Sequence, residues 1–355
     1  MTLQQEIDAF NPSLPLEQAE TPPSSWYKSN EVYEAERHRV FAPHWQVIGR
    51  VDQLMEPGSY VTLHIAGEPL VAMRGEDGVL RAFFNVCRHH ATCVLSGAGR
   101  TERVVCPYHG WEYYLDGRLK QAPRLGAAQS FVREDHGLIP AEIDTWGPWA
   151  FVRARSGGPC LDTVIGPSRD RLVLDGLRFF AQRSYELDCN WKVYVDNYLD
   201  GGYHVAHLHR RLASSLDMDS YRTEVFDHSV IQSCQGNPQS TARVGQEQLY
   251  IWLHPAFMIN RYGPFMDTNF AIPLGANRCR VIFDYFVEES FGASDPFLAQ
   301  SLAASDEVQR EDMDICGSVQ RGLESSAFDT GRYSVTHERG AHHFHRLLHA
   351  DLMAG

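Results

Sequence analysis

The sequence predicts an α+β protein in which a small antiparallel β domain precedes a larger domain of mixed strands and helices. Residues 45–153 alternate short β-type runs with turn signals such as Glu76-Asp77-Gly78. A helical pattern runs from Pro296 to Leu323 behind Asp295, a residue type that caps helix N-termini. A strand-like run from Arg278 to Glu289 lies in the same half, so we expect the sheet and helices there to share a core.

The elements can be placed in chain order. Residues 1–44 are expected to form an arm, rich in proline and serine from Pro12 to Ser25, and a helix that packs on the larger domain. Residues 154–355 should form that domain, with a second helix from Glu338 to Leu352. The strands of the β domain are expected at Tyr60 to Ile65, Leu70 to Met73, Leu80 to Phe84, Arg103 to Val105 and Trp111 to Leu115.

Composition excludes several classes of protein. Hydrophobic residues make up 43% and charged residues 22% of the 355, which is typical of globular chains. No apolar run reaches the ~18 residues of a membrane span, and a net charge of −13 disfavours nucleic acid as a partner. The N-terminus has no basic-then-apolar order, so we expect no signal peptide and a cytoplasmic location. Eight cysteines in such a chain are expected to be core thiols or metal ligands.

The β domain contains a C-x-H pair and a C-x-x-H pair, formed by Cys87 and His89 and by Cys106 and His109. Two loops that each offer one thiolate and one imidazole can hold a [2Fe-2S] cluster, with two cysteines on one iron and two histidines on the other. The alternative is a structural Cys2His2 zinc site, although zinc fingers usually pair cysteine with cysteine and histidine with histidine.

A second group of polar residues lies between Asn190 and His209. Three histidines, His204, His207 and His209, fall within six positions beside two aspartates. On an ideal helix His204 and His207 are neighbours, whereas His204 and His209 lie about 140° apart. Spacing alone therefore does not choose between them as metal ligands.

The helix from Pro296 carries one carboxylate, Asp312, in register with an apolar stripe. A carboxylate on a buried face is costly unless it is paired or bound to a metal, whereas Glu311 falls off that face and is expected to be solvated. Asp312 is therefore a candidate ligand for a 2-His-1-carboxylate iron site. The stripe consists of Leu298, Leu302, Val308, Ile315, Val319 and Leu323.

These motifs resemble those of the Rieske non-heme iron oxygenases, and the resemblance covers nearly the whole chain. The second cluster loop, from Cys106 to Trp111, matches the family's C-P-Y-H-G-W pattern, and Asn190 to Lys192 matches its N-W-K lead-in. The resemblance implies an oxygenase (alpha) component with a Rieske [2Fe-2S] domain and a catalytic domain that holds mononuclear Fe(II). Its ligand sets would be Cys87, His89, Cys106 and His109 for the cluster, and His204, His209 and Asp312 for the iron. His207 is then left beside the site or at the surface.

The resemblance also implies an acid that links the first iron histidine to the cluster histidine of a neighbouring subunit, and therefore a homotrimer. Many members carry this acid three residues before the histidine, where this chain has Gly201. Asp200, four residues before, is the candidate, and Asp196 is the alternative. Asn197 and Asn190 complete the implied catalytic set.

Within the family the chain is most similar to the choline monooxygenase branch, for example from Asp196 to His204 and from Phe257 to Pro264. This implies hydroxylation beside the nitrogen of a quaternary or tertiary amine. An ammonium group is recognised by aromatic faces. The alternative is a neutral or aromatic substrate, because Phe265 stands where plant members carry tryptophan. The candidate substrate contacts are Trp252, Tyr262, Phe265 and Phe270, with Tyr250 and Phe257 as further aromatics.

Electrons from NAD(P)H are expected to arrive through a separate reductase, because the chain has neither a G-x-G-x-x-G turn nor a plant-type ferredoxin cysteine run. O2 would react at open positions of the iron. The segment from Arg81 to Arg124 holds seven basic and three acidic residues, or +4, so we expect an acidic ferredoxin or flavin-containing reductase to bind over the cluster loops. The remaining alternatives are a Rieske electron carrier and a zinc-stabilised binding protein.

Overall fold

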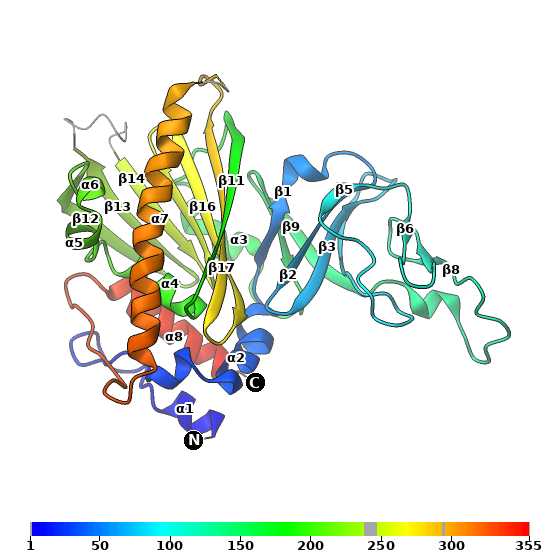
Figure 1. The fold of residues 1–355 in the computed structure, drawn as a ribbon, viewed down its shortest axis with the longest axis horizontal. Coiled ribbons are helices and arrows are strands. Elements are labelled where there is room, and N and C mark those ends of the chain that lie inside the picture. The colour runs from blue at the N-terminus through cyan, green and yellow to red at the C-terminus, as the bar shows by residue number, and fades with distance from the viewer. Residues whose placement is uncertain (1, 238–246, 293–294, 355) are drawn as a thin grey trace. The chain divides into compact units, whose positions relative to one another are not determined.

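The computed structural model describes residues 2–237, 247–292 and 295–354. The chain divides into two compact units (Figure 1). One unit is residues 41–159, and the other combines residues 1–40 with residues 160–355. The smaller unit is all β and the larger unit contains both sheet and helices, so the predicted α+β fold class is confirmed.

The smaller unit, the β unit, contains a seven-stranded sheet in the order β1-β10-β9-β4-β3-β2-β5 and a three-stranded sheet in the order β6-β7-β8. Neighbouring strands in both sheets are antiparallel. The strands are β1 (Gln46–Arg50), β2 (Ser59–Ile65), β3 (Glu68–Arg74), β4 (Leu80–Phe84), β5 (Ala98–Arg100), β6 (Val104–Val105), β7 (Glu112–Tyr113), β8 (Leu119–Gln121), β9 (Pro140–Trp146) and β10 (Trp149–Arg153), with short helical turns at η3 (Val51–Leu54) and η4 (Arg133–His136).

The larger unit is built on one antiparallel sheet in the order β11-β17-β16-β15-β14-β13-β12. From β12 to β17 each strand pairs with the next one along the chain, and β11 closes the edge beside β17. The elements are α1 (Leu3–Asp8), η1 (Ser24–Tyr27), α2 (Asn30–Glu36), α3 (Leu161–Arg169), β11 (Leu177–Leu187), α4 (Trp191–Leu199), α5 (Val205–Leu208), α6 (Arg210–Ala213), β12 (Leu216–Phe226), β13 (Ser229–Gly236), β14 (Glu247–Leu253), β15 (Phe257–Tyr262), β16 (Phe265–Gly275), β17 (Arg278–Glu288), α7 (Pro296–Leu323) and α8 (Arg339–Met353), and a π turn, η2 (Arg37–Phe41), follows α2.

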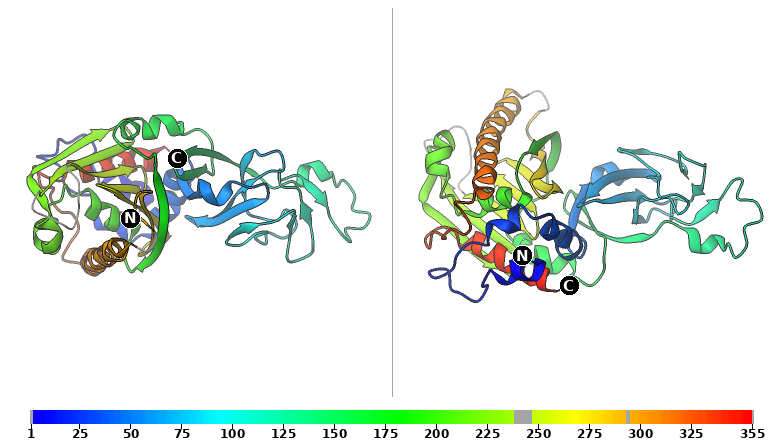
Figure 2. Two further views of the ribbon diagram at one scale, coloured as in Figure 1. Left: turned by 90° about the horizontal axis from the view of Figure 1, so that it is seen from above. Right: turned by 60° about the horizontal axis from the view of Figure 1, so that its bottom comes forward.

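Helix α4 lies at the centre of this unit. It contacts β16 and β17 of the sheet and both long helices, α7 and α8 (Figures 1 and 2). Its first five residues, 191–195, are all buried. A helix at the surface buries only one face, so this helix is surrounded on all sides at its start. The residues at its C-terminal end therefore have fixed positions relative to the sheet and to α7.

Helix α7 begins and ends where the sequence predicts. The Asp295 side chain accepts a hydrogen bond from the Phe297 N–H, and Pro296 occupies the first turn. The predicted apolar stripe is partly wrong, because Ile315 and Val319 are 39% and 45% exposed. The buried row is mostly polar and runs through Ser305, Gln309, Asp312, Cys316, Gln320 and Leu323. Among the described residues, no helix is both long and apolar enough to cross a bilayer.

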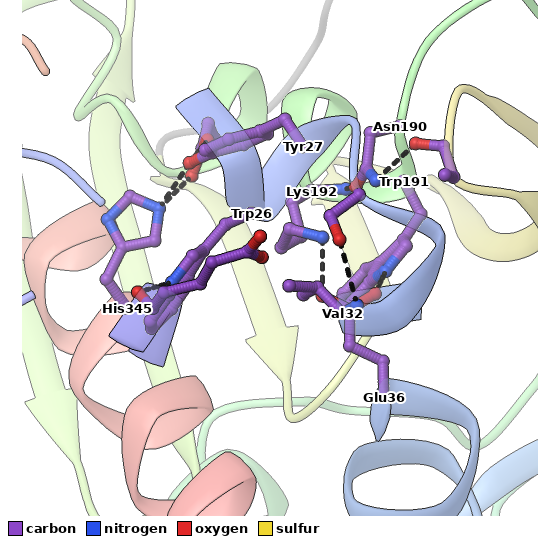
Figure 3. Close-up of polar contacts among 12 residues, drawn as sticks. Trp26, Tyr27, Val32, Glu36, Asn190, Trp191, Lys192 and His345 are labelled. Carbon is purple, nitrogen blue, oxygen red and sulfur yellow. Dashed lines mark hydrogen bonds and ion pairs between the residues drawn. The ribbon is translucent and has the colours of Figure 1, made fainter. Parts of the chain in front are cut away.

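The start of α4 is anchored to the N-terminal segment by a buried polar cluster (Figure 3). Glu36 at the end of α2 accepts a hydrogen bond from the Trp191 indole at 2.8 Å and forms an ion pair with Lys192. Both charged side chains are fully buried, so removing either one would leave an uncompensated charge in the core. Burial lowers the pKa of Lys192, and the Glu36 carboxylate opposes that shift.

Candidate metal centres

The two cluster loops of the β unit have the same backbone geometry. The Ala91 N–H donates to the Cys87 carbonyl, and the Gly110 N–H donates to the Cys106 carbonyl, both at 3.0 Å. Ala91 and Gly110 both lie in the left-handed region, with φ of 58° and 72°. Each loop therefore reverses direction four residues after its cysteine, just beyond its histidine.

These loops bring together the four predicted cluster ligands. Cys87 and Cys106 are buried, and each is 2% exposed. Burial, and then contact with the Cys87 thiol, raise the pKa of Cys106 against the effect of two backbone N–H groups. The Nδ1 atoms of His89 and His109 lie 3.2 Å apart, and His109 is exposed. Two inner thiols and two outer imidazoles fit the two irons of a Rieske cluster.

A single zinc ion fits this arrangement less well. Ligand atoms of a zinc tetrahedron lie within about 3.8 Å of one another, given bonds of about 2.0–2.3 Å. Among the described residues, no three of these four side chains bring their ligand atoms within 4.8 Å of one another. A wider set of ligands is what a two-iron cluster requires.

Aromatic side chains support the cluster ligands. The Tyr113 hydroxyl lies 3.3 Å from the Cys87 sulfur and accepts a hydrogen bond from the Arg88 N–H. Burial, together with Cys87, raises the pKa of Tyr113, so its hydroxyl keeps its proton. The His89 ring stacks on Trp111 with centroids 4.8 Å apart. Partial burial and the neighbouring imidazoles of His90 and His109 lower the pKa of His89, which favours the neutral form that binds metal.

A second candidate centre lies in the larger unit. The ligand atoms of His204, His209 and Asp312 all lie within 4.8 Å of one another. His204 and His209 flank α5, and Asp312 comes from α7 more than a hundred residues later. Two histidines and one carboxylate are the ligand set of many non-heme iron(II) sites.

The loop between α4 and α5 requires glycine. Gly201 and Gly202 both have positive φ values, 70° and 74°. A Cβ atom on Gly201 would lie 2.3 Å from the His337 carbonyl oxygen. Because only glycine fits this turn, the chain can reverse between Asp200 and His204.

Each iron-site histidine is held by a carboxylate on the ring nitrogen that points away from the centre. The Nδ1 atom of His204 lies 2.7 Å from Asp200 Oδ2, and that of His209 lies 2.6 Å from Glu311 Oε2. Their Nε2 atoms are thereby turned toward Asp312, whose Oδ1 is 2.9 Å from His209 Nε2. Such partners fix the tautomer and orientation of a metal-binding imidazole.

Asp312 has its own partner, since Asn197 donates to Asp312 Oδ1 at 2.9 Å. Burial alone would lower the pKa of His209, but the carboxylates of Asp312 and Glu311 outweigh burial and raise it. Glu311 was predicted to be a solvated charge, and this is only partly correct: its side chain is 39% exposed, but its carboxylate contacts His209. Glu311 lies beside the buried row of α7, and its carboxylate reaches His209 from the edge of that row.

A cavity of about 120 Å³ opens beside the three candidate iron ligands. Five aromatic rings line it, and burial raises the pKa of Tyr194, Tyr198 and Tyr221, so these phenols are neutral. The Tyr221 and Tyr250 rings are stacked. The aromatic lining is Tyr194, Tyr198, Tyr221, Tyr250 and Phe283, and further polar side chains come from Gln232, Asn260, Asp267, Asn269 and Gln309.

Most of the predicted substrate contacts do not belong to the described lining of this cavity. Among the described residues that line this cavity, only Tyr250 of the six aromatics is present. Trp252 is covered by Phe344 of α8, and Phe265 packs on Phe297 of α7. Phe270 and Phe257 are cross-strand partners in the core, and the hydroxyl of the buried Tyr262 donates to Asp267. The alternation of residues along a strand predicts which side chains are buried. It does not predict which of the buried side chains lie next to a cavity.

Other predicted residues have structural contacts. Asn190 caps α4: its side chain accepts from the Lys192 N–H and donates to the Ala276 carbonyl, and it is not among the described residues that line the cavity. Asp196 accepts a hydrogen bond from Tyr27 and lies 2.9 Å from His345 Nε2, whereas Asp200 is the carboxylate against His204. His207 is exposed. His345 lies between the hydroxyls of Tyr27 and Tyr333, so this part of the histidine-rich C-terminal helix packs within the unit.

Comparisons with known proteins match both units. Residues 44–132 match the Rieske [2Fe-2S] domain, and residues 174–354 match the ring hydroxylating alpha subunit (catalytic domain). The chain is 44% identical to the chloroplastic choline monooxygenase of Arabidopsis thaliana, over 98% of this chain and 86% of the relative. It is 30% identical to the carnitine monooxygenase oxygenase subunit of Acinetobacter pittii (strain PHEA-2), over 86% of each.

A solved structure has the same fold over nearly its whole length. The quaternary ammonium Rieske monooxygenase CntA, in complex with L-carnitine, superposes with a TM-score of 0.84 at 28% identity. The match covers 96% of this chain and 97% of that one. Both units and their order along the chain are therefore shared with that oxygenase.

Proposed function

The chain belongs to the Rieske non-heme iron oxygenases, as the oxygenase component of a multi-component oxidoreductase, and we propose that its substrate is a choline-like alkylammonium compound. The observation that carries the proposal is the cavity beside His204, His209 and Asp312, whose walls carry four tyrosine rings and a phenylalanine. Aromatic faces bind ammonium groups that cannot donate hydrogen bonds.

The overall reaction consumes one O2, two electrons and two protons: R–H becomes R–OH, and the second oxygen atom leaves as water. The [2Fe-2S] cluster and the mononuclear iron, when bound, supply the electron transfer and the activation of O2. Cys87, His89, Cys106 and His109 would hold the cluster, and His204, His209 and Asp312 would hold the iron.

The chain's own residues prepare the site. Asp200 and Glu311 hold the two imidazoles, and Asn197 holds the Asp312 carboxylate, so the three ligands are oriented before substrate arrives. Burial raises the pKa of Tyr194 and of Tyr198, so the aromatic lining carries no phenolate charge beside the substrate. The cavity meets His204, His209 and Asp312, so a substrate bound in it would lie beside the iron that these residues would hold.

Electrons are proposed to enter through Asp200. This residue and Asn197 line the substrate cavity and also a second cavity of about 260 Å³ between α7, α8 and the N-terminal segment. Apolar side chains at the second cavity are exposed, among them Ile315, Val319 and Phe328. A neighbouring subunit's cluster histidine could reach Asp200 from this side, and the structure of a similar quaternary ammonium Rieske monooxygenase gives insights into inter-subunit electron transfer. This supports a homotrimer in which each centre is completed by a neighbour.

The electron donor is proposed to be an acidic ferredoxin or flavin-containing reductase that takes its electrons from NAD(P)H. Of the seven basic residues near the cluster loops, four are paired with acids. Arg88, Arg100 and Arg124 are exposed and have no ion pair among the described residues. The rate of cluster reduction by the donor should fall with rising salt, and fall further in Arg88→Glu and Arg124→Glu, because steering is screened over about 10 Å at 0.1 M salt. A reduction rate indifferent to both would contradict this site.

The proposed location is the cytoplasm. All eight cysteines are free thiols in the structure, and two of them are the candidate cluster ligands. Free thiols of this kind persist in a reducing compartment. Fractionation of the native cells, with antibodies against the chain, would test it.

The function is tested by supplying the anaerobically loaded protein with a surrogate reductase, NADH and a panel of amines. Oxidation of choline or a related alkylammonium compound, with O2 consumption matched to product, is the expected result. Coupled oxidation of a neutral aromatic compound, with no turnover of any ammonium compound, would instead identify a ring-hydroxylating oxygenase. Electron transfer with no product from either class would identify an electron carrier.

A further inference from the structure

The substrate cavity is lined by side chains that are buried or half-buried. Among the described residues in its lining, none is exposed. A substrate must therefore pass between some of these side chains to reach the candidate iron ligands. Two neighbouring cavities share lining residues with it, and each of them marks a possible route.

The first neighbour is the second cavity described above, which shares Asn197 and Asp200 with the substrate cavity. Both shared side chains are tied to candidate iron ligands, because Asn197 donates to Asp312 and Asp200 holds His204. Moving this wall would break the hydrogen bonds that orient the ligands. The second cavity is therefore poorly suited to opening for every substrate molecule.

The other neighbour, the outer cavity, has a volume of about 220 Å³ and is lined mainly by α6 and α7. It reaches the surface, because Arg211, Gln300 and Ala304 in its lining are exposed. Three residues line both the outer cavity and the substrate cavity, and these are His209, Leu212 and Val308. The shared side chains therefore separate the solvent side from the candidate iron site.

The three shared residues differ in how firmly they are held. His209 is fixed by Glu311 and Asp312. Leu212 and Val308 are half-buried, and their aliphatic side chains have no hydrogen bonds that a change of rotamer would break. The passage between the two cavities can therefore widen at Leu212 and Val308 while His209 stays in place.

The attachment of α6 to α7 also permits such a movement. Leu212 belongs to α6, which is only four residues long. Arg211 in the same helix lies 3.0 Å from Glu307 of α7, and the two side chains are 80% and 46% exposed. Exposed ion pairs stabilise little, so this one does not hold α6 rigidly against α7.

We propose that substrate enters and product leaves through the outer cavity, and that Leu212 and Val308 form the neck of this route and limit the size of what passes. This inference rests on the proposed function, which places the substrate beside the candidate iron ligands. Electrons enter on the other side, at Asp200 and the second cavity. Substrate therefore exchanges without displacing the neighbouring subunit.

The test separates a neck from a binding wall. A neck is a barrier on the path, so narrowing it slows entry and exit by the same factor and leaves the dissociation constant unchanged. In oxidised holoenzyme without a reductant, we expect Leu212→Phe to slow choline exchange at least about tenfold and to keep Kd within about threefold. The line shape of the choline methyl NMR signal measures exchange, and equilibrium dialysis measures Kd.

The opposite change decides the matter if the narrowed variant does not fold. Leu212→Ala and Val308→Ala should raise the exchange rate of the bulkier (2-hydroxyethyl)triethylammonium ion at least about tenfold relative to that of choline. The matched control is Leu302→Ala, a half-buried leucine of α7 outside the described lining of all three cavities. We expect this variant to keep both exchange rates. All variants are compared at equal iron content.

Unchanged exchange in Leu212→Phe and in both alanine variants would overturn the inference, because substrate would then enter elsewhere. A changed Kd with an unchanged entry rate would also overturn it, since Leu212 and Val308 would then only form part of the binding wall. If no ammonium compound binds, the proposed function fails. The same comparison with 3,3-dimethylbutan-1-ol, a neutral compound of choline's shape, then still tests the route.

Discussion

The two candidate metal centres use histidine in opposite orientations. In the cluster loops the Nδ1 atoms of His89 and His109 face each other, so their Nε2 atoms lie on the outer side of the rings. At the iron site His204 and His209 give Nδ1 to carboxylates and turn Nε2 inward. His109 is exposed, whereas His209 is 2% exposed. The cluster loops leave one imidazole at the surface, whereas carboxylates hold both imidazoles of the candidate iron site beside a cavity.

The largest expected effect is the loss of one centre without the other. The loaded protein should hold about three irons per chain, two in the cluster and one mononuclear. Asp312→Ala should lose one iron and all turnover, because it removes a ligand together with the partner of His209 Nε2, and should keep the visible spectrum of the cluster. His109→Ala should lose the cluster spectrum and keep the mononuclear iron. Iron analysis with absorption spectra checks both, and loss of both centres in either variant would show that they are not independent.

The second largest effect is expected on electron transfer between the two centres. Asp200→Asn should keep both metals but slow reoxidation of the reduced cluster by about ten- to a hundredfold, because an amide cannot accept from two imidazoles as a carboxylate does. Single-turnover stopped-flow absorption measures this rate. Asp196→Asn tests the alternative bridge, since Asp196 contacts Tyr27 and His345 and lines the same second cavity; we expect normal reoxidation in this variant. Normal reoxidation in Asp200→Asn, or full activity of an isolated monomer, would contradict electron entry through a neighbouring subunit.

A smaller effect distinguishes the partners of the iron histidines. Glu311→Gln should lower iron affinity about tenfold, because the amide weakens the hold on His209 Nδ1, and should leave the cluster unchanged. Glu307→Gln on the same helix is the control, since Glu307 pairs with the exposed Arg211. Iron retention during titration with a chelator measures the difference. Equal retention in the two variants would show that Glu311 does not position the ligand.

The smallest effect concerns the cluster alone. Tyr113→Phe should lower the reduction potential of the cluster, because it removes a hydroxyl 3.3 Å from the Cys87 sulfur. A hydrogen bond worth about 1 kcal/mol corresponds to about 40 mV for a one-electron couple. Protein-film voltammetry measures the shift, and iron content at His204, His209 and Asp312 should not change. An unchanged potential would mean that the hydroxyl does not donate to the sulfur.

The same contrast explains how much could be predicted from sequence. The candidate cluster ligands lie on two short loops of fixed spacing, so their residue types and intervals alone suggest a cluster. The candidate iron ligands flank α5 and lie on α7, and spacing could not choose between His207 and His209. Helix α7 was placed to the residue because Asp295 and Pro296 mark its start, and Asp312 falls on its buried face.

The cavity was the least predictable part. Its wall depends on which end of each strand meets α4 and α7, and the alternation of residues along a strand carries no such information. Trp252, Phe265 and Phe270 were therefore indistinguishable in sequence from Tyr250, which does line the cavity. Asp267, which also lines the cavity, gave no local signal at all, because a single aspartate in a strand becomes unusual only when its burial and its partners are known.

The discontinuity of the larger unit has a consequence for biosynthesis. Glu36 is made early, yet its partners Trp191 and Lys192 follow about 155 residues later, which at typical rates of translation is a delay of roughly 8–30 s. The β unit begins and ends within that interval, and its first and last strands, β1 and β10, pair side by side. It can therefore close on itself while the N-terminal segment waits. We expect nascent chains to acquire a protease-resistant β unit first and the α2–α4 anchor only after release of α4 from the ribosome.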